Sequence, residues 1–281
     1  MKITRRDFLK TTALTSLYFA GFGGAAYSNT RTKKNLVIIM LRGGMDGLCA
    51  IPVKGDKNFE KLRSKINLDR TLKLTSDFDL HPALKTFKNL WDENLSAAVH
   101  ATNIPYTGRS HFDGQNLMES GGKIPYQEKT GWLGRGMKIA GLTGNGLALA
   151  LPMPLLIRGV PMNNNYFPVG HKLPYPSTLK MIQEVYKEYD EKLLSENLEI
   201  IQTRELSNTS TDSSWVLASN AANELSKADG PRVAVFEVDG FDTHAAQGAT
   251  NGAHADCLSD YDNIVKSLKS SMSKEAFDNT L

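Results

Sequence analysis

Apolar runs typical of buried strands alternate along the chain with segments in which apolar residues follow helical spacing. Three runs predict core strands: 36–41, 95–101 and 232–238. Five segments predict helices: 83–91, 112–120, 131–139, 178–206 and 256–268. Short runs at 147–151 and 155–157 predict two further strands beside prolines. Because strands and helices alternate and the strongest strands lack a polar face, we expect an α/β fold, an αβα sandwich with a mostly parallel sheet.

The first 28 residues show, in order, the charged, apolar and small-residue regions of a secretory signal. Arg5 and Arg6, followed by Phe8 and Leu9, resemble the signal read by the twin-arginine (Tat) export machinery. The alternative is a membrane anchor, but the glycine-rich apolar run is too short to span a core of about 30 Å comfortably. We therefore expect 1–28 to be a Tat-type signal peptide cleaved near Ser28. The remaining 29–281 would be periplasmic or secreted, with no stable membrane span.

Charge outside this leader is balanced. The chain has 33 basic and 30 acidic residues, and the leader holds four and one of these, which leaves 29 of each. A neutral body lacks the basic surface that nucleic-acid binding requires, so we expect no nucleic-acid partner. After export, Cys49 and Cys257 would meet an oxidising compartment, where they either pair or remain buried free thiols.

Side chains able to bind metal or attack an ester follow each predicted core strand. Asp46 follows the first, Ser110 and His111 follow the second, and Asp242 and His244 follow the third. The carboxyl ends of parallel strands meet at one edge of the sheet, where ligands bind, so we expect these side chains to converge. Asp and His together suit Zn²⁺ or a similar divalent ion. A serine beside such an ion can attack an ester, because the metal stabilises the alkoxide.

Structural roles compete for the same residues. Asp46, between glycines, fits a turn in which its carboxylate accepts backbone N–H groups. Ser110 fits a helix N-cap, since Asp113 stands three residues later. The His111 imidazole could equally have a structural role, in helix capping or in ring stacking. The other histidines are interpreted structurally: loop residues His81 and His171, core residue His100, and an exposed His254.

Five motifs occur along the chain in the order LRGGMDG (41–47), LHPAL (80–84), RSHFDGQ (109–115), GWLGR (131–135) and GFDTH (240–244). Together with the leader, they resemble the family of exported bacterial proteins called domain of unknown function 1501. That family is similar to a branch of the alkaline phosphatase and sulfatase superfamily. The resemblance implies a metal-dependent αβα sheet with Asp46 as first ligand, Ser110 as nucleophile, Asp242 and His244 as further ligands, and His111 as an extra ligand or acid.

The same resemblance implies an incomplete domain. Similar family members continue past the helix at 256–268 into another core strand, and then carry Glu-Phe-Gly-Arg-like and Asp-His-Gly-like motifs that this sequence lacks. We therefore expect 29–281 to be a partial alkaline phosphatase-like domain with an exposed apolar sheet edge and weak metal binding. Two functions follow as hypotheses. One is a metal-dependent hydrolase of small phosphate or sulfate esters, and the other is a non-catalytic periplasmic or surface scaffold or binding protein.

Overall fold

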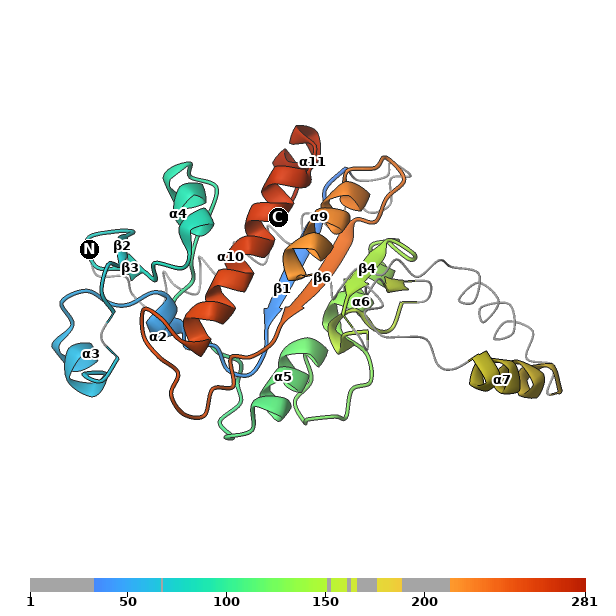
Figure 1. Cartoon of the computed structure of the whole chain (residues 1–281), viewed down its shortest axis with the longest axis horizontal. Helices are drawn as coiled ribbons and strands as arrows, with labels where there is room; N and C mark the ends of the chain where they lie inside the picture. The colour runs from blue at the N-terminus through green and yellow to red at the C-terminus, as the bar shows by residue number, and fades with distance from the viewer. Residues whose placement is uncertain (1–32, 67, 151–152, 161–162, 166–175, 189–212) are drawn as a thin grey trace.

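A computed structural model describes residues 33–66, 68–150, 153–160, 163–165, 176–188 and 213–281 (Figure 1). The predicted signal peptide, His171 and the second half of the predicted helix at 178–206 lie outside these residues. Within the described ranges, no helix has both the length and the apolar character needed to cross a membrane.

A four-stranded, wholly parallel sheet forms the centre of the described structure. Its strand order is β1 (Leu36–Leu41), β6 (Val233–Val238), β4 (Gly146–Leu149) and β5 (Asn164–Asn165). β1 and β6 pair along their whole length, from Leu36 opposite Val233 to Leu41 opposite Val238. A separate antiparallel pair joins β2 (Leu72–Lys73) to β3 (Asp79–Leu80). The predicted α/β class and the parallel pairing of the first and third core strands are confirmed.

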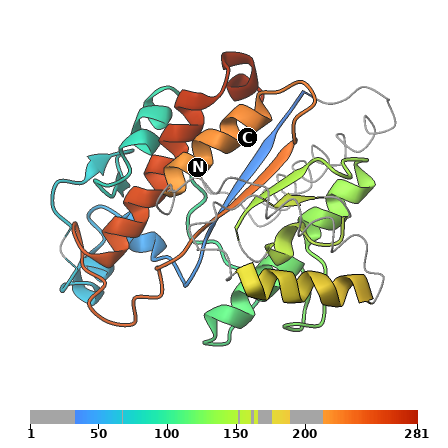
Figure 2. The same ribbon diagram turned by 45° about the vertical axis from the view of Figure 1, so that its right-hand side comes forward.

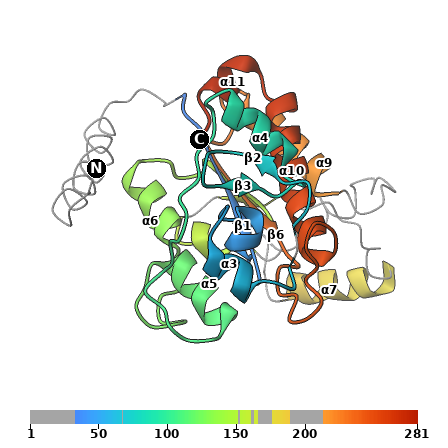
Figure 3. The same ribbon diagram turned by 90° about the vertical axis from the view of Figure 1, so that its left-hand side faces the viewer.

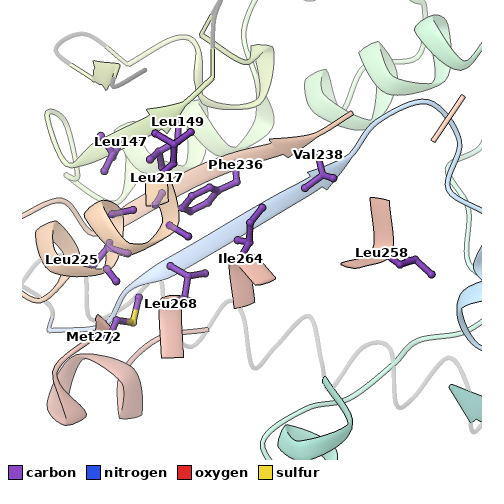
Figure 4. Close-up of a cluster of buried hydrophobic side chains, with 14 of the residues drawn as sticks. Leu147, Leu149, Leu217, Leu225, Phe236, Val238, Leu258, Ile264, Leu268 and Met272 are labelled. Atoms are coloured by element: carbon purple, nitrogen blue, oxygen red, sulfur yellow. The ribbon is translucent and has the colours of Figure 1, made fainter. Parts of the chain in front are cut away.

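Helices cover both faces of this sheet, because side chains along each strand point alternately to opposite sides. Phe236 and Val238 pack against α9 (Ser214–Leu225) and α10 (Ala253–Ser271), in the cluster drawn in Figure 4. Val233 and Val235 pack on the other side, against α6 (Trp132–Ile139) and the 3₁₀ turn η2 (Leu155–Ile157). Figure 2 shows β1 and β6 running between these two groups of helices.

The remaining helices lie around this framework. They are α2 (Gly47–Ala50), α3 (Lys57–Leu62), α4 (Lys85–Asp92), α5 (His111–Ser120), α7 (Pro176–Glu188) and α11 (Lys274–Asp278). The helices predicted at 83–91, 112–120, 131–139 and 256–268 are therefore confirmed, and so is the strand at 147–151. α9 was not predicted, because its apolar face consists largely of alanine, which gives a weak periodic signal.

Two predicted strands are wrong. Residues 155–157 form a 3₁₀ turn that begins after Pro154. Residues 95–101 belong to no strand, and Leu95 and Val99 are 58% and 81% exposed. A strand needs a neighbouring edge to supply its hydrogen bonds. The outer side of β1 instead pairs at its start with the last three residues of the chain, where Val37 N–H donates to the Leu281 carbonyl at 2.8 Å.

Candidate functional site

The candidate site lies where β1 and β6 end side by side. Both strands run toward α5 and α2 and finish beside them (Figure 1). Gly43, directly beyond β1, has φ +108°, and a Cβ placed there would lie 2.5 Å from the backbone nitrogen of Asp242. Only glycine combines this left-handed backbone with such a close approach. Gly43 therefore lets the loop that carries Asp242 pass directly against the tip of β1.

Asp242 is the centre of an acid–imidazole group on this edge. Its Oδ2 lies 2.9 Å from His244 Nε2 and 3.7 Å from His111 Nε2. His111 is the first residue of α5, and His244 comes from the same loop as Asp242. All three side chains are partly or largely exposed to solvent. The structure thus brings together three of the five predicted site residues, with an imidazole oriented by a carboxylate as proton transfer requires.

Asp242 and His111 line an open cavity of about 670 Å³, whereas His244 is not part of its wall. Its wall also contains further charged residues: Arg42, Glu119, Arg158, Glu237 and Asp239. The position is the one expected for ligands of a parallel sheet, outside the carboxyl ends of its strands. Its size is that of sites for small molecules.

A largely buried ionic cluster that the sequence pattern did not reveal lines this cavity. The Arg42 guanidinium binds Glu119 Oε1 at 2.8 Å and also contacts Glu237 Oε1. The other carboxylate oxygen of Glu119 accepts the Leu156 N–H and so holds η2 in place. Burial raises the pKa of Glu237; Arg42 offsets this only in part, and the nearby charges of Glu119 and Asp239 raise that pKa further. This cluster could have been found from Glu237, a carboxylate within the otherwise apolar strand Val233–Val238. A buried charge of this kind requires a partner.

Asp46 lies at the end of β1 but is fully engaged elsewhere. It is the N-cap of α2, where Oδ1 accepts the Cys49 N–H at 3.2 Å. Its Oδ2 accepts a hydrogen bond from Gln247 at 2.8 Å and forms an ion pair with Arg63. Burial alone would raise the pKa of the Asp46 carboxyl, but the bonds from Gln247 and Arg63 outweigh it and hold that pKa below its usual range. The structural alternative for Asp46, a carboxylate that accepts backbone N–H, is therefore present.

Two buried side chains, Cys49 and His254, lie near the hydrogen-bonded Asp46 carboxylate. Cys49 is fully buried, and burial together with Asp46 raises the pKa of its thiol to about 11. Of the two alternatives left open by the sequence, a disulfide or free thiols, the structure has Cys49 and Cys257 as free thiols. His254, predicted to be exposed, is 1% exposed and packs edge-on against Phe241, which corrects that expectation. The loop before α10 is held by residues distant in sequence, since Gln247 donates to Asp46 and the Ala249 carbonyl contacts His81, and local sequence does not encode this placement.

Ser110 occupies the N-cap of α5. Its Oγ accepts the Asp113 N–H at 3.2 Å, which is the helix-capping alternative considered from the sequence. Within the described part of the chain, no hydrogen bond joins Ser110 to His244 or Asp242. His81, interpreted as structural, is buried and bridges Ala83 N–H and the Ala249 carbonyl. His100, predicted in the core, is half-buried and contacts the Ile51 carbonyl.

A metal ion bound by protein side chains needs several donors that converge on one point. Among the described residues, no group of three or more His, Cys, Asp or Glu side chains is arranged in this way. His111 and His244 both face the same Asp242 oxygen, so these groups are placed to contact one another. Their donor chemistry suits Zn²⁺, whereas their arrangement here is that of a hydrogen-bonded group.

Comparison with protein-family models, with curated proteins and with solved structures found no match to this chain. The function is therefore inferred from the residues and geometry of the site.

Proposed function

We propose that this protein is an exported, alkaline phosphatase/sulfatase-like hydrolase of small phosphate or sulfate esters, and that Asp242 is the central residue of its site. The observation that carries the proposal is the position of Asp242. It lies between His111 and His244 in an open cavity at the carboxyl edge of a parallel sheet. The sequence motifs around Asp46, Ser110 and Asp242 support the same function by their resemblance to the family named above.

An anionic substrate is favoured by what faces the cavity. The first turn of α5 contributes His111 and Phe112 to its wall, and the N-terminal end of a helix attracts anions. Arg158 lies in the same wall and is not paired with any carboxylate among the described residues. The guanidinium of Arg42, by contrast, is neutralised by Glu119 and Glu237. Arg158 and His111 are therefore the groups proposed to bind the phosphate or sulfate oxygens.

Asp242, His244 and His111 are the side chains proposed to hold a divalent ion, with Asp46 as a fourth. A bound Zn²⁺ would supply Lewis-acid stabilisation of a nucleophilic oxygen. The Asp46 carboxylate reaches such an ion only after it leaves Arg63 and Gln247. Ser110, as proposed nucleophile, must likewise exchange its bond to Asp113 N–H for one to substrate. Because both residues must first give up these bonds, we expect weak metal binding and little turnover.

A non-catalytic binding or scaffold role is the second candidate. It is favoured by the finding that Asp46 and Ser110 already have complete structural roles as helix caps. In that case the cavity binds a small molecule or peptide without transforming it, and Asp242 and His244 act only as polar contacts.

Zinc binding and ester hydrolysis, measured on the same variants, separate the two candidates. Calorimetric titration with Zn²⁺ and hydrolysis of p-nitrophenyl phosphate would be compared for the protein, Asp242→Asn and the matched control Asp278→Asn, an exposed carboxylate on α11. We expect one weak zinc site, weakened at least roughly tenfold by Asp242→Asn and unchanged by Asp278→Asn. Any zinc-dependent hydrolysis should disappear with Asp242→Asn.

Equal zinc affinity in the two variants would contradict the role of Asp242 as ligand and favour the scaffold. Rapid zinc-dependent hydrolysis would instead contradict the expectation that the bonds held by Asp46 and Ser110 keep metal binding weak and turnover low.

A further inference from the structure

Glu237 is the one charged residue of β6, and it lies in the wall of the candidate cavity. One of its carboxylate oxygens, Oε1, contacts the Arg42 guanidinium. The other oxygen, Oε2, accepts no hydrogen bond from any described residue, and it does not belong to the described polar atoms that are both buried and unpaired. Oε2 is therefore accessible from the cavity.

Glu119, the second carboxylate on the same guanidinium, has both oxygens engaged. Oε1 accepts a hydrogen bond from Arg42 at 2.8 Å, and Oε2 accepts the Leu156 N–H at 2.9 Å. Its side chain is 5% exposed, compared with 15% for Glu237. Figures 1 and 3 show α5, which carries Glu119, beneath the ends of β1 and β6. Of these two carboxyl groups, Glu237 is the one placed to exchange a proton with a ligand.

The charges around Glu237 favour its protonated form. The single guanidinium of Arg42 faces two carboxylates in a place largely shielded from water, so the fully ionised cluster carries one more negative than positive charge. Asp239, just beyond β6, adds a further carboxylate to the same wall. Burial raises the pKa of Glu237 above its usual range, and the attraction of Arg42 does not cancel the combined effect of burial, Glu119 and Asp239.

We propose that Glu237 is the general acid that protonates the departing alcohol, and that the substrates are esters of aliphatic alcohols. This proposal rests on the hydrolase function proposed above. An aliphatic alkoxide is a strong base, so it leaves readily only if it receives a proton as the ester bond breaks. Arg158 and His111, proposed to bind the phosphate or sulfate oxygens, line the same cavity as Glu237. The alcohol oxygen of an ester bound there can lie beside Oε2.

The proposed step is balanced for a phosphate ester. The nucleophilic oxygen of the enzyme forms a bond to phosphorus, and the bond to the alcohol oxygen breaks with its electron pair going to that oxygen. Glu237 transfers its proton to the same oxygen, so the neutral alcohol leaves and the Glu237 carboxylate remains beside Arg42. A water molecule then forms a bond to phosphorus, gives its proton to Glu237 and displaces the oxygen of the enzyme. Ester and water have become alcohol and phosphate.

Two esters with different leaving groups test the proposal. n-Butyl phosphate releases a strongly basic alkoxide, whereas p-nitrophenyl phosphate releases a weakly basic phenolate that needs no proton. Phosphate release is measured with zinc-loaded protein in excess over ester. The variants are Glu237→Gln and the control Glu224→Gln, which removes a carboxylate from α9 outside the cavity. Glu237→Gln should slow n-butyl phosphate hydrolysis by about 100-fold or more and p-nitrophenyl phosphate hydrolysis by less than about threefold. Glu224→Gln should change neither rate.

A second measurement follows the proton itself and does not depend on turnover. The side-chain carboxyl groups of glutamate are labelled with ¹³C, and the metal-free protein is titrated by NMR. We expect one glutamate resonance to titrate at higher pH than those of the exposed glutamates, and to be missing from Glu237→Gln. Hydrolysis of n-butyl phosphate should decline over the same pH range, because ionised Glu237 has no proton to donate. Hydrolysis of p-nitrophenyl phosphate should show no such decline.

The outcomes separate this proposal from the hydrolase function. Equal losses for the two esters in Glu237→Gln would overturn the role of Glu237 as general acid and leave the hydrolase function in place. A Glu237 resonance that titrates together with the exposed glutamates would overturn that role as well. If near-ultraviolet circular dichroism shows that Glu237→Gln does not fold, the titration and pH profiles of the unmodified protein decide. Hydrolysis of neither ester by the unmodified protein would overturn the hydrolase function, and this proposal with it.

Discussion

Asp46 and Asp242 follow neighbouring parallel strands, yet their surroundings differ completely. The Asp46 carboxylate accepts hydrogen bonds from Cys49 N–H, Gln247 and Arg63, and its side chain is 18% exposed. The Asp242 carboxylate is 39% exposed and, among the described side chains, faces the imidazoles of His111 and His244 alone. A carboxylate whose oxygens are already satisfied by fixed donors stabilises the fold, whereas one that faces solvent and imidazoles is available to a ligand.

The difference originates in the loops that follow the two strands. The loop after β1 turns at once into α2, and Asp46 caps that helix. The loop after β6 runs on without regular structure to the start of α10, so Asp242 and His244 stay at the surface while Gln247 returns to Asp46. The loop after β6 therefore has two roles. Gln247 completes the hydrogen bonding of Asp46, and Asp242 and His244 are candidate site residues.

The largest expected effect is on stability and distinguishes the two carboxylates directly. Asp46→Ala removes a helix cap and leaves Arg63 without its partner, so the free energy of unfolding should fall by about 2–4 kcal/mol. Asp242→Ala at the exposed site should change it by less than about 0.5 kcal/mol. Urea denaturation measures both. Similar losses in the two variants would show that Asp242 is also a structural residue.

The second prediction concerns pH and His254. Burial lowers the pKa of His254, although the nearby Asp46 carboxylate offsets part of this effect, while His81 and Arg63 add to it. The unfolded chain therefore binds a proton more readily, and stability is complete above pH 6.5. It is lost as the pH falls below that value, by up to about 1.4 kcal/mol per pH unit until the folded-state pKa is reached.

Because both ring nitrogens of His254 lack partners in the described structure, His254→Leu should remove this loss without lowering stability at pH 8. His244→Leu, at an exposed imidazole, is the control and should retain the loss. Thermal unfolding between pH 8 and pH 5 is the measurement. An unchanged pH dependence in His254→Leu would contradict the prediction.

The smallest expected effect concerns Ser110. Ser110→Ala removes the N-cap of α5 and should cost about 1 kcal/mol, whereas Ser110→Asp retains a capping acceptor and should cost little. If Ser110 is also the nucleophile, both variants should lose any zinc-dependent hydrolysis, although only one of them loses stability. Hydrolysis that persists in Ser110→Asp would leave Ser110 with the capping role alone.

Part of the fold could be predicted because its signals are local. β1 and β6 are continuous apolar runs, and α5, α6 and α10 have helical spacing, so all five were identified within a few residues. The segment 95–101 has the same apolar character and is not a strand, because pairing depends on which edge is within reach. α9 was missed because alanine provides little hydrophobic contrast.

The sequence by itself determined the α/β class and the parallel pairing of the two principal strands, and it placed Asp242 and His244 directly beyond β6. His111 was expected at the same edge through a strand at 95–101 that does not form, so its position beside Asp242 was decided by the tertiary structure. Only the tertiary structure decided that Asp46 is held by Arg63 and Gln247, that Arg42 joins Glu119 to Glu237, and that His254 is buried. The physical reason is the sequence separation over which each signal acts. Apolar periodicity acts between neighbours in the chain, whereas the partner of a charge or a strand edge is chosen among groups that are distant in sequence and meet only after the chain has folded.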